Sequence, residues 1–268
     1  MSQSLRVFFR NDDVNELCPE LRELTELCIS EKVPIAHAVE PANVTRECVD
    51  WLLEKKAKHG RLVEIIQHGY DHTWHGKGEY GGDRPYETVQ EEIRSGAKLM
   101  DRYFGDQWFR AMVFPFGYYN RASMKAVSDL GFLLMSCHWN PRLSRRLFYQ
   151  AGRLLRQGLI RGRHASPHMN FYPGTRVLSV DTTVSYIRRY FGGHTGTESE
   201  WFDLDTLMAR HEAAREHIST IGWITHHRYH TKPEHIKLIA DSIAEMKRRD
   251  PEIRFLNYEE IYRERQDA

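Results

Sequence analysis

The chain has no long hydrophobic run and no excess of charge of one sign. Its longest apolar segments, such as Ala111–Phe114, are only a few residues long, whereas a membrane-spanning helix needs about 20 apolar residues. Basic residues number 38 and acidic residues 37 among 268, which leaves a formal net charge of +1. We therefore expect no transmembrane segment, and this overall charge predicts no binding to nucleic acid or to an anionic membrane.

Closely spaced cysteine pairs, a signal-peptide pattern in the first residues shown and internal linkers are also not found. The four cysteines form no CxxC pair, which argues against a zinc knuckle and a disulfide framework. The N-terminal sequence MSQSLRVFFRNDD has no basic segment followed by an apolar stretch, so we expect a cytoplasmic protein. No repeat, low-complexity tract or Pro/Gly/Ser linker divides the sequence, and residues 1–268 are interpreted as one domain.

Short apolar runs alternate with longer amphipathic stretches, as in strands separated by helices. The predicted strands cover residues 5–9, 33–38, 61–67, 108–114, 132–136, 176–180, 222–225 and 253–256. The predicted helices cover residues 19–30, 44–59, 86–104, 122–130, 204–220 and 233–249, and a short helix ends the chain. The alternation predicts an α/β fold with a mostly parallel sheet, open or closed into a barrel. The Arg-rich residues from about 139 to 175 interrupt it, so we predict an insertion there.

Four of the predicted strands run into residues that can do chemistry. These segments are Arg10-Asn11-Asp12-Asp13, His68-Gly69-Tyr70-Asp71-His72, Pro115-Phe116-Gly117-Tyr118 and His226-His227. In parallel α/β folds the functional groups gather at the carboxyl ends of the strands, so we expect the four segments to converge. Histidine is also abundant, with 15 copies, and this residue type serves both metal binding and acid–base catalysis.

The residue types suit a hydrolytic metal site. His68 and His72 share a face if the backbone after the strand is helical, and together they can bind one cation. Catalytic zinc sites often combine two histidines with one carboxylate. Asp12 and Asp13 can supply one ligand and one free carboxylate, which would remove a proton from water acidified by the metal ion. A histidine from a distant strand could then protonate the leaving group.

Each segment also has a structural interpretation. An Asp-Asp pair after a strand is common in turns and helix caps, and histidines four residues apart occur on exposed helix faces. His226 and His227 could be structural histidines with satisfied hydrogen bonds. His72 with His75 is an alternative pair of metal ligands. The pair His68 and His72 is favoured because it begins where the strand ends. The joint occurrence at four strand ends favours a functional site.

In these motifs the chain resembles the polysaccharide deacetylases with the NodB homology domain, carbohydrate esterase family 4. The family's TFDDG segment is similar to Arg10–Val14, and its histidine-pair motif is similar to His68–His72. Its RPPYG segment is similar to Val113–Gly117, and its Leu-x-His segment is similar to Ile224–His226. The resemblance implies a distorted (β/α)7-type barrel, one divalent metal ion, zinc, and the removal of acyl groups from sugars.

The resemblance also implies a role for each site residue. It makes Asp13, His68 and His72 the metal ligands, Asp12 the catalytic base, the Phe116 N–H the oxyanion donor and His226 the general acid.

Several positions depart from the family pattern. Gly69 replaces a Ser or Thr, Val14 replaces a Gly, and Val113 replaces an Arg. Arg10 and Arg228 are candidates, by sequence position, to supply the missing cation.

The fourth family motif is not recognisable. It should lie near residues 136–140, with Asp181 as a rival, and neither is assigned a catalytic role. Five further histidines are interpreted as surface residues rather than as part of the groove: His138, His164, His168, His194 and His230.

The implied enzyme is a metal-dependent hydrolase that removes an N-acyl group, acetyl, from an amino sugar in a polysaccharide or an O-antigen or capsule precursor. A cytoplasmic member would act on a nucleotide sugar or a lipid-linked saccharide. The alternatives are a deformylase of a lipid-linked amino sugar, a catalytically inactive saccharide-binding member of the same fold, and a hydrolase of non-sugar amides. The sequence predicts no oligomeric state.

Overall fold

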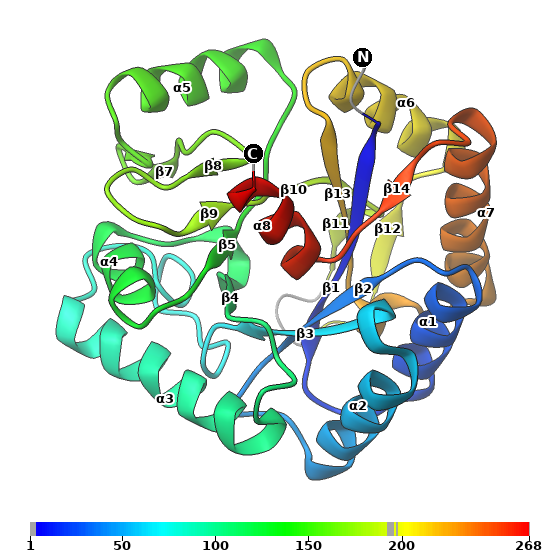
Figure 1. Cartoon of the computed structure of the whole chain (residues 1–268), viewed down its shortest axis with the longest axis horizontal. Helices are drawn as coiled ribbons and strands as arrows, with labels where there is room; N and C mark the ends of the chain where they lie inside the picture. Colours follow the sequence, from blue (N-terminus) through cyan, green and yellow to red (C-terminus); the bar gives the residue numbers. More distant parts are fainter. Residues whose placement is uncertain (1–3, 192–195, 197, 268) are drawn as a thin grey trace.

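The computed structural model describes residues 4–191, 196 and 198–267, and most of its strands form one sheet (Figure 1). The strands of this sheet are β1 (Arg6–Val14), β2 (Ile35–Val39), β3 (Val63–His68), β4 (Ala111–Val113), β5 (Leu134–Ser136), β8 (Asn170–Phe171), β9 (Leu178–Ser179), β10 (Thr182–Ser185), β13 (Thr220–Thr225) and β14 (Arg254–Phe255). Their order is β10-β13-β1-β2-β3-β4-β5-β9-β8, with β14 beside β1. Every pair is parallel except β8 with β9.

Helices follow most of the strands and surround the sheet in Figure 1. They are α1 (Pro19–Ser30), α2 (Arg46–His59), α3 (Tyr86–Phe104), α4 (Arg121–Asp129), α6 (Leu204–Arg215), α7 (Pro233–Arg249) and α8 (Tyr258–Gln266). Side chains cap the N-termini of several helices. The Thr45 hydroxyl accepts a hydrogen bond from the Cys48 N–H at the start of α2, and Asn120 and Asn257 form capping boxes at the starts of α4 and α8. These helices confirm the predicted alternation of strands and helices.

The two ends of the sheet meet at residues 178–185. The Val180 N–H donates to the Met135 carbonyl at 2.9 Å, and the Thr182 N–H donates to the Cys137 carbonyl at 3.0 Å. Thr182 also pairs with Gly222 of β13. One segment, β9 with β10, therefore joins β5 to β13, and seven strand positions form the predicted distorted (β/α) barrel.

The predicted insertion is confirmed. Residues 139–175 contain α5 (Leu143–Leu154), a small hairpin of β6 (Leu159–Ile160) and β7 (Arg163–His164), and β8. In Figure 1, α5 lies at the upper left edge of the molecule, outside the ring of strands. A second hairpin, β11 (Ile187–Tyr190) with β12 (Ser199–Trp201), follows β10. This second hairpin was not predicted from the sequence.

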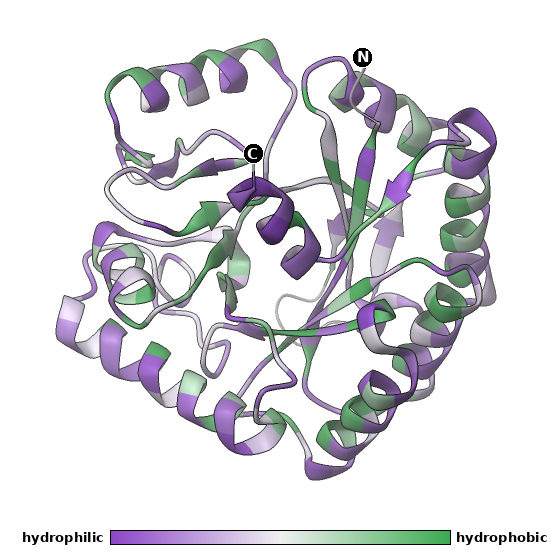
Figure 2. Ribbon diagram, viewed as in Figure 1, coloured by the Kyte–Doolittle hydropathy of each residue, from purple (hydrophilic) through white to green (hydrophobic). Residues whose placement is uncertain are grey.

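The barrel interior is apolar at one end and polar at the other. Phe8, Ile66, Val113 and Leu178 belong to one buried cluster, which includes Tyr258 from α8. Alternate residues of a strand share a face, so Arg10 and Asp12 of β1 follow Phe8 on the inward side. Figure 2 shows hydrophobic and hydrophilic residues alternating along the surrounding helices, as amphipathic helices require. None of the helices in the described residues has the length and apolarity to cross a membrane.

Candidate active site

A pocket of about 510 Å³ lies at the carboxyl ends of the barrel strands. All four chemistry-bearing segments contribute to it, so the predicted convergence is confirmed. Its lining comprises Arg10, Asp12, Asp13, His68, His72, Phe114, Phe116, Gly117, Ser136, Cys137, His138, Thr182, Ser185, Tyr190, Ile224, His226 and Tyr229.

A backbone irregularity brings both aspartates into the pocket. The prediction that the first strand ends at residue 9 was wrong, because β1 continues to Val14 and Asn11 still pairs with Thr225 of β13. Neighbouring residues of a regular strand face opposite sides. The β1–β2 register shifts between Asn11 and Val14, and Asp13 has φ +60°. This bulge turns the Asp13 carboxylate toward the same pocket as Asp12.

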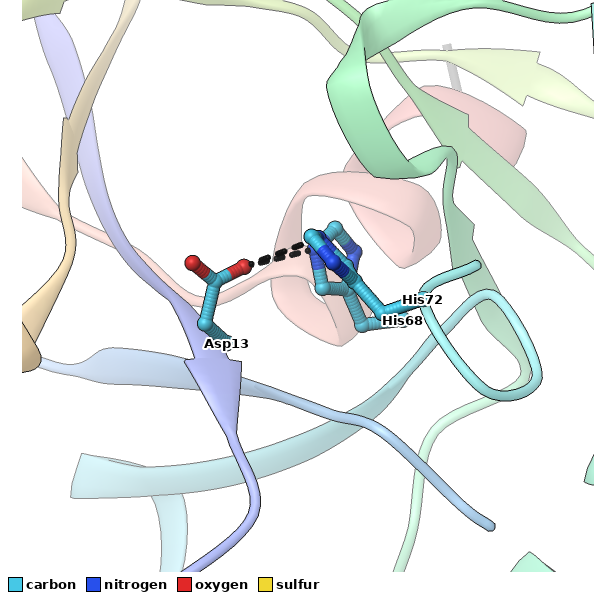
Figure 3. A group of neighbouring side chains, drawn as sticks. All are labelled: Asp13, His68 and His72. Atoms are coloured by element: carbon cyan, nitrogen blue, oxygen red, sulfur yellow. Dashed lines mark hydrogen bonds and ion pairs between the residues drawn. The ribbon is translucent and has the colours of Figure 1, made fainter. Parts of the chain in front are cut away.

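Asp13, His68 and His72 form a compact group of metal-ligand side chains (Figure 3). The Asp13 Oδ1 lies 3.2 Å from the Nε2 atom of each histidine. One ligand atom from each residue lies within 4.8 Å of the others, and Asp13 and His68 are buried. A tetrahedral zinc ion with ordinary bond lengths separates its ligand atoms by about 3.3 Å. The donor set and its spacing therefore fit a divalent cation.

The surroundings of His68 support the same conclusion. Its Nδ1 lies 3.2 Å from the Val113 carbonyl, while its Nε2 faces Asp13. Burial works against the charged ring, but the charges of Asp12 and Asp13 and the Asp13 hydrogen bond raise the pKa of His68 to about 9. Without a cation both nitrogens need protons to face oxygen atoms. With a cation, neutral His68 donates its Nδ1–H to Val113 and turns the Nε2 lone pair to the metal.

Asp13 remains an anion in this group. Burial alone would raise its pKa, but the charge of His226 and the hydrogen bonds from His68 and His72 hold the pKa of Asp13 well below its usual range. An ionised carboxylate is the form that ligates a metal ion.

The two histidines come together through a turn rather than on a helix face. After His68, Gly69 has φ +58° and His72 has φ +60°. Glu79 holds this turn, because its Oε1 accepts the N–H of Tyr70 at 2.7 Å and that of Asp71 at 3.2 Å.

The turn accounts for the glycine at position 69. A Cβ there would lie 2.2 Å from Glu79 Oε2, and the backbone is left-handed. The alternative pair of His72 with His75 is not found, because His75 is exposed and lies outside the ligand group.

Arg10 supplies the cation that is absent at Val113. Its Nη2 donates to Asp12 Oδ2 at 2.9 Å, and its Nε lies 2.7 Å from Asp12 Oδ1, so the two side chains form a close buried ion pair. Its Nη1 donates to Ser136 Oγ at 2.7 Å. Arg228, the other candidate, only approaches Asp13, at 3.9 Å.

His226 directly follows β13, the strand beside β1, and comes one residue after the Asn11–Thr225 pair. Its Nδ1 is 3.1 Å from the hydroxyl of Tyr190. Burial lowers the pKa of His226, although Asp13 and Asp12 oppose the shift. The neighbouring His227 donates its backbone N–H to Asn11 Oδ1 at 2.9 Å, which ties this loop to β1. Sequence reasoning missed Tyr190, because no spacing or motif connects the β11–β12 hairpin to residue 226.

Phe116 lies beside the ligand group. Its backbone is left-handed, with φ +60°. Its ring centroid lies 4.3 Å from that of His72 and 5.0 Å from that of Trp74. Phe116 therefore borders the pocket on the side of the metal ligands.

No family model and no curated protein matches the sequence. Among solved structures, a putative polysaccharide deacetylase from Mycobacterium smegmatis has a TM-score of 0.68 at 11% identity, over 100% of this chain and 92% of that one. The chain has the polysaccharide deacetylase fold. A family 4 acetyl xylan esterase from Clostridium thermocellum, in complex with a cobalt ion, has a TM-score of 0.57 at 9% identity, over 96% and 90% of the two chains.

The fold is not confined to proteins named for sugar substrates. Puue allantoinase has a TM-score of 0.64 at 11% identity, over 98% of this chain and 90% of its own. At such low identity, the polysaccharide deacetylase fold is what these similarities show.

Asp181, a rival for the fourth family motif, lies outside the pocket lining of this polysaccharide deacetylase fold. It is wholly buried, its Oδ2 is 3.0 Å from His164 Nε2, and its Oδ1 accepts the Cys137 N–H at 2.9 Å. Its own N–H donates to His168 Nδ1 at 3.0 Å. These contacts hold the insertion to the barrel.

The remaining histidines fall into different classes. His138 lines the pocket. His164, His168 and His230 are buried, so their interpretation as surface residues was wrong. Their ring nitrogens take hydrogen bonds inside the fold, as in the 2.7 Å contact of His230 with the Thr225 hydroxyl. His194 lies outside the described residues.

Proposed function

We propose that the chain is a metal-dependent hydrolase that removes an N-acyl group, acetyl, from an amino sugar in a polysaccharide or an O-antigen or capsule precursor. The observation that carries this proposal is the position of Asp12. Asp12 lies beside the ligand group but is not part of it, and the buried Arg10 contacts both of its carboxylate oxygens. A site that only binds a metal or a sugar needs no such second carboxylate, whereas hydrolysis needs a base.

Each site residue has a separate role in the proposed reaction. A divalent cation held by Asp13, His68 and His72 would act as a Lewis acid on the acyl carbonyl and would acidify water. Asp12 accepts the proton of the attacking water, since each of its oxygens keeps a lone pair beside the Arg10 contacts. The Phe116 N–H donates to the developing oxyanion, a contact worth about 3 kcal/mol in other hydrolases.

His226 gives a proton to the departing amine. Its lowered pKa makes the protonated ring a stronger acid than a histidine in water, which favours this transfer. The Tyr190 hydroxyl at Nδ1 orients the ring, so that Nε2 is the nitrogen left for the substrate. The pocket volume, about 510 Å³, is in the usual range for small-molecule sites.

The proposed metal is Zn²⁺. A set of two histidines and one carboxylate suits zinc and also accepts other divalent transition metals. We propose a nucleotide sugar or a lipid-linked saccharide as the carrier of the acyl group. A formyl group on a lipid-linked amino sugar would need the same residues, since the chemistry differs only in the acyl substituent.

A second candidate function, hydrolysis of a non-sugar amide, is favoured by one observation. An allantoinase shares the fold over nearly the whole chain. An inactive saccharide-binding protein is the third candidate. The position of Asp12 beside the ligand group, but outside it, favours catalysis over this third candidate, because binding alone needs no base.

Elemental analysis of protein purified without chelator tests the metal site. We expect about one equivalent of a divalent transition metal in the wild type and none in a His68→Ala/His72→Ala double variant. Absence of metal in the wild type, even after incubation with zinc or cobalt, would exclude the proposed chemistry.

Acyl release from a panel of N-acetylated and N-formylated sugars and simple amides tests the reaction. We expect Asp12→Asn to keep its metal and to lose acyl release by a factor of 10² or more, as for loss of a general base. Full activity of metal-loaded Asp12→Asn would show that Asp12 is not the base. Turnover of simple amides but not of sugars would favour the second candidate.

A further inference from the structure

The insertion carries a local charge that the overall charge conceals. Between residues 130 and 180 there is no Asp, Glu or Lys, but there are eight arginines: Arg142, Arg145, Arg146, Arg153, Arg156, Arg161, Arg163 and Arg176. The whole chain has a net charge of +1, so removing these eight leaves the remainder at −7. Seven of the eight lie in the insertion, residues 139–175, and Arg176 follows it directly, so positive charge is concentrated on this part of the chain.

These arginines are not used for ion pairs within the fold. Among the described residues, none of the eight lies within ion-pair distance of a carboxylate, whereas Arg84, Arg110 and Arg248, elsewhere in the chain, each pair with one. Arg145 and Arg146 contact the carbonyl of His164 and the ring of His217. Most of the eight side chains are exposed.

The same part of the chain exposes large apolar side chains. Leu143, Leu147 and Leu154 of α5 are 65%, 61% and 82% exposed, and Leu155, just after the helix, is 61% exposed. Residues four and seven apart lie on one helix face, so the three helical leucines form one stripe. Figure 2 shows hydrophobic residues alternating with hydrophilic ones along α5, at the outer edge of the molecule.

This stripe is not the face that α5 packs against the barrel. The buried residues of the helix are Tyr149 and Gly152, which lie on the opposite side. Tyr149 stacks on Trp139 and its hydroxyl accepts the N–H of Asn140. An amphipathic helix normally turns its leucines to the core, whereas α5 turns them outward, next to the exposed Arg142 and Arg153.

We propose that the outer face of α5 and the adjoining arginines form a docking surface for an anionic phospholipid bilayer. Arginine attracts the acidic headgroups, and the leucine stripe enters the boundary between headgroups and acyl chains, as interfacial helices do. A nucleic-acid surface would have no use for the leucines. A second copy of the chain would bring eight more arginines against the same face. The insertion leaves the barrel directly after the pocket residue His138, so the docking surface adjoins the site.

Co-flotation of the purified chain with vesicles tests this surface. We expect binding to phosphatidylcholine vesicles that contain about 30% phosphatidylglycerol, and much weaker binding to pure phosphatidylcholine or at high salt. Arg153→Gln/Arg163→Gln and Leu147→Gln/Leu154→Gln should each weaken vesicle binding by about tenfold. The matched control, Lys98→Gln/Arg102→Gln on the exposed face of α3, should bind as the wild type does.

The outcomes distinguish bilayer binding from binding of a second copy or of nucleic acid, and they do not depend on the proposed function. Circular dichroism of each variant checks that the fold is kept. Absence of vesicle binding by the wild type overturns the proposal. A wild-type dimer that becomes monomeric in the leucine variant would assign the surface to a second copy of the chain and also overturn the proposal. Nucleic-acid binding that is lost only in the arginine variant would assign the surface to nucleic acid and overturn it too. Metal content and acyl release play no part in these measurements, so loss of the proposed function would leave the bilayer result standing.

Discussion

Arg10 and Asp12 form a buried ion pair inside the barrel, with N···O distances of 2.7 and 2.9 Å. Both residues belong to β1. Val113, at the position of the family's arginine, instead packs in the apolar interior. Arg10, which lines the pocket, therefore provides a cation there although residue 113 is apolar.

Removing the Arg10 side chain should therefore damage both stability and activity. Arg10→Ala leaves Asp12 buried without its partner, at a cost of about 3–5 kcal/mol in the free energy of unfolding, and should lower kcat/KM with the metal content unchanged. Arg228→Gln is the matched control, because its 3.9 Å approach to Asp13 is worth at most about 1 kcal/mol. Urea unfolding and acyl-release kinetics measure the two effects. A larger loss in the Arg228 variant would reverse the assignment.

Tyr190 should act through His226 rather than on the substrate carbonyl. Tyr190→Phe removes the hydroxyl at His226 Nδ1 and keeps the ring, whose centroid lies 5.0 Å from that of Tyr229. We expect kcat to fall by about tenfold, in the range of one positioning hydrogen bond, with KM and metal content unchanged. Tyr229→Phe, a change of the same size in the same pocket, should have little effect on kcat. An equal loss in both variants would mean that the hydroxyl has no special role.

Gly69→Ala should weaken metal binding. The new Cβ would meet Glu79 Oε2 at 2.2 Å on a backbone with φ +58°, so the turn that aims His68 and His72 must shift. Outer contacts of this kind typically change metal affinity by about 10- to 100-fold. Gly76→Ala is the control, since Gly76 is also left-handed, φ +82°, but has open space around its Cβ position. Competition with a zinc chelator compares the two. Equal metal affinities of the two variants would show that the turn held by Glu79 does not position the metal ligands.

Acid should destabilise the fold in part through His211. Burial lowers the pKa of His211 to about 4, and its Nδ1 accepts the Trp223 N–H at 3.2 Å. A histidine in the unfolded chain titrates near 6.5, so between about pH 6.5 and pH 4 the unfolded state binds the additional proton. The stability from neutral His211 is therefore complete above about pH 6.5 and declines by roughly 3 kcal/mol toward pH 4.

His211→Gln should flatten this part of the pH profile, because a glutamine oxygen can accept the Trp223 bond without titrating. His75→Gln, at an exposed position, is the control and should leave the profile unchanged. Urea unfolding at a series of pH values gives the slopes. The same decline in wild type and His211→Gln would assign the acid sensitivity to other buried groups.

Periodicity alone was enough for the long elements of the fold. The bounds of α3 and α7 match the predicted helices residue for residue. A long amphipathic helix repeats its apolar residues with a clear period of 3.6. The end of β1 was mispredicted, because its last residues are polar and nothing local shows that a pocket will satisfy them. The β11–β12 hairpin was missed because it interrupts the strand–helix alternation without a strong turn signal.

The order of the motifs was sufficient to bring Asp12, Asp13, His68 and His226 to one pocket. Parallel strands align their carboxyl ends, so residues that follow different strands become neighbours whatever lies between them. The sequence by itself therefore determined which residue types meet and at which end of the barrel they meet.

Tertiary structure alone decided how these residues are aimed. The left-handed backbone at Asp13 and His72 depends on a bulge and on a turn held by Glu79, and the selection of Arg10 over Arg228 depends on distance. Tyr190 reaches His226 across 36 residues of sequence. Such orientations are properties of packing between distant segments, which no local pattern of residues encodes.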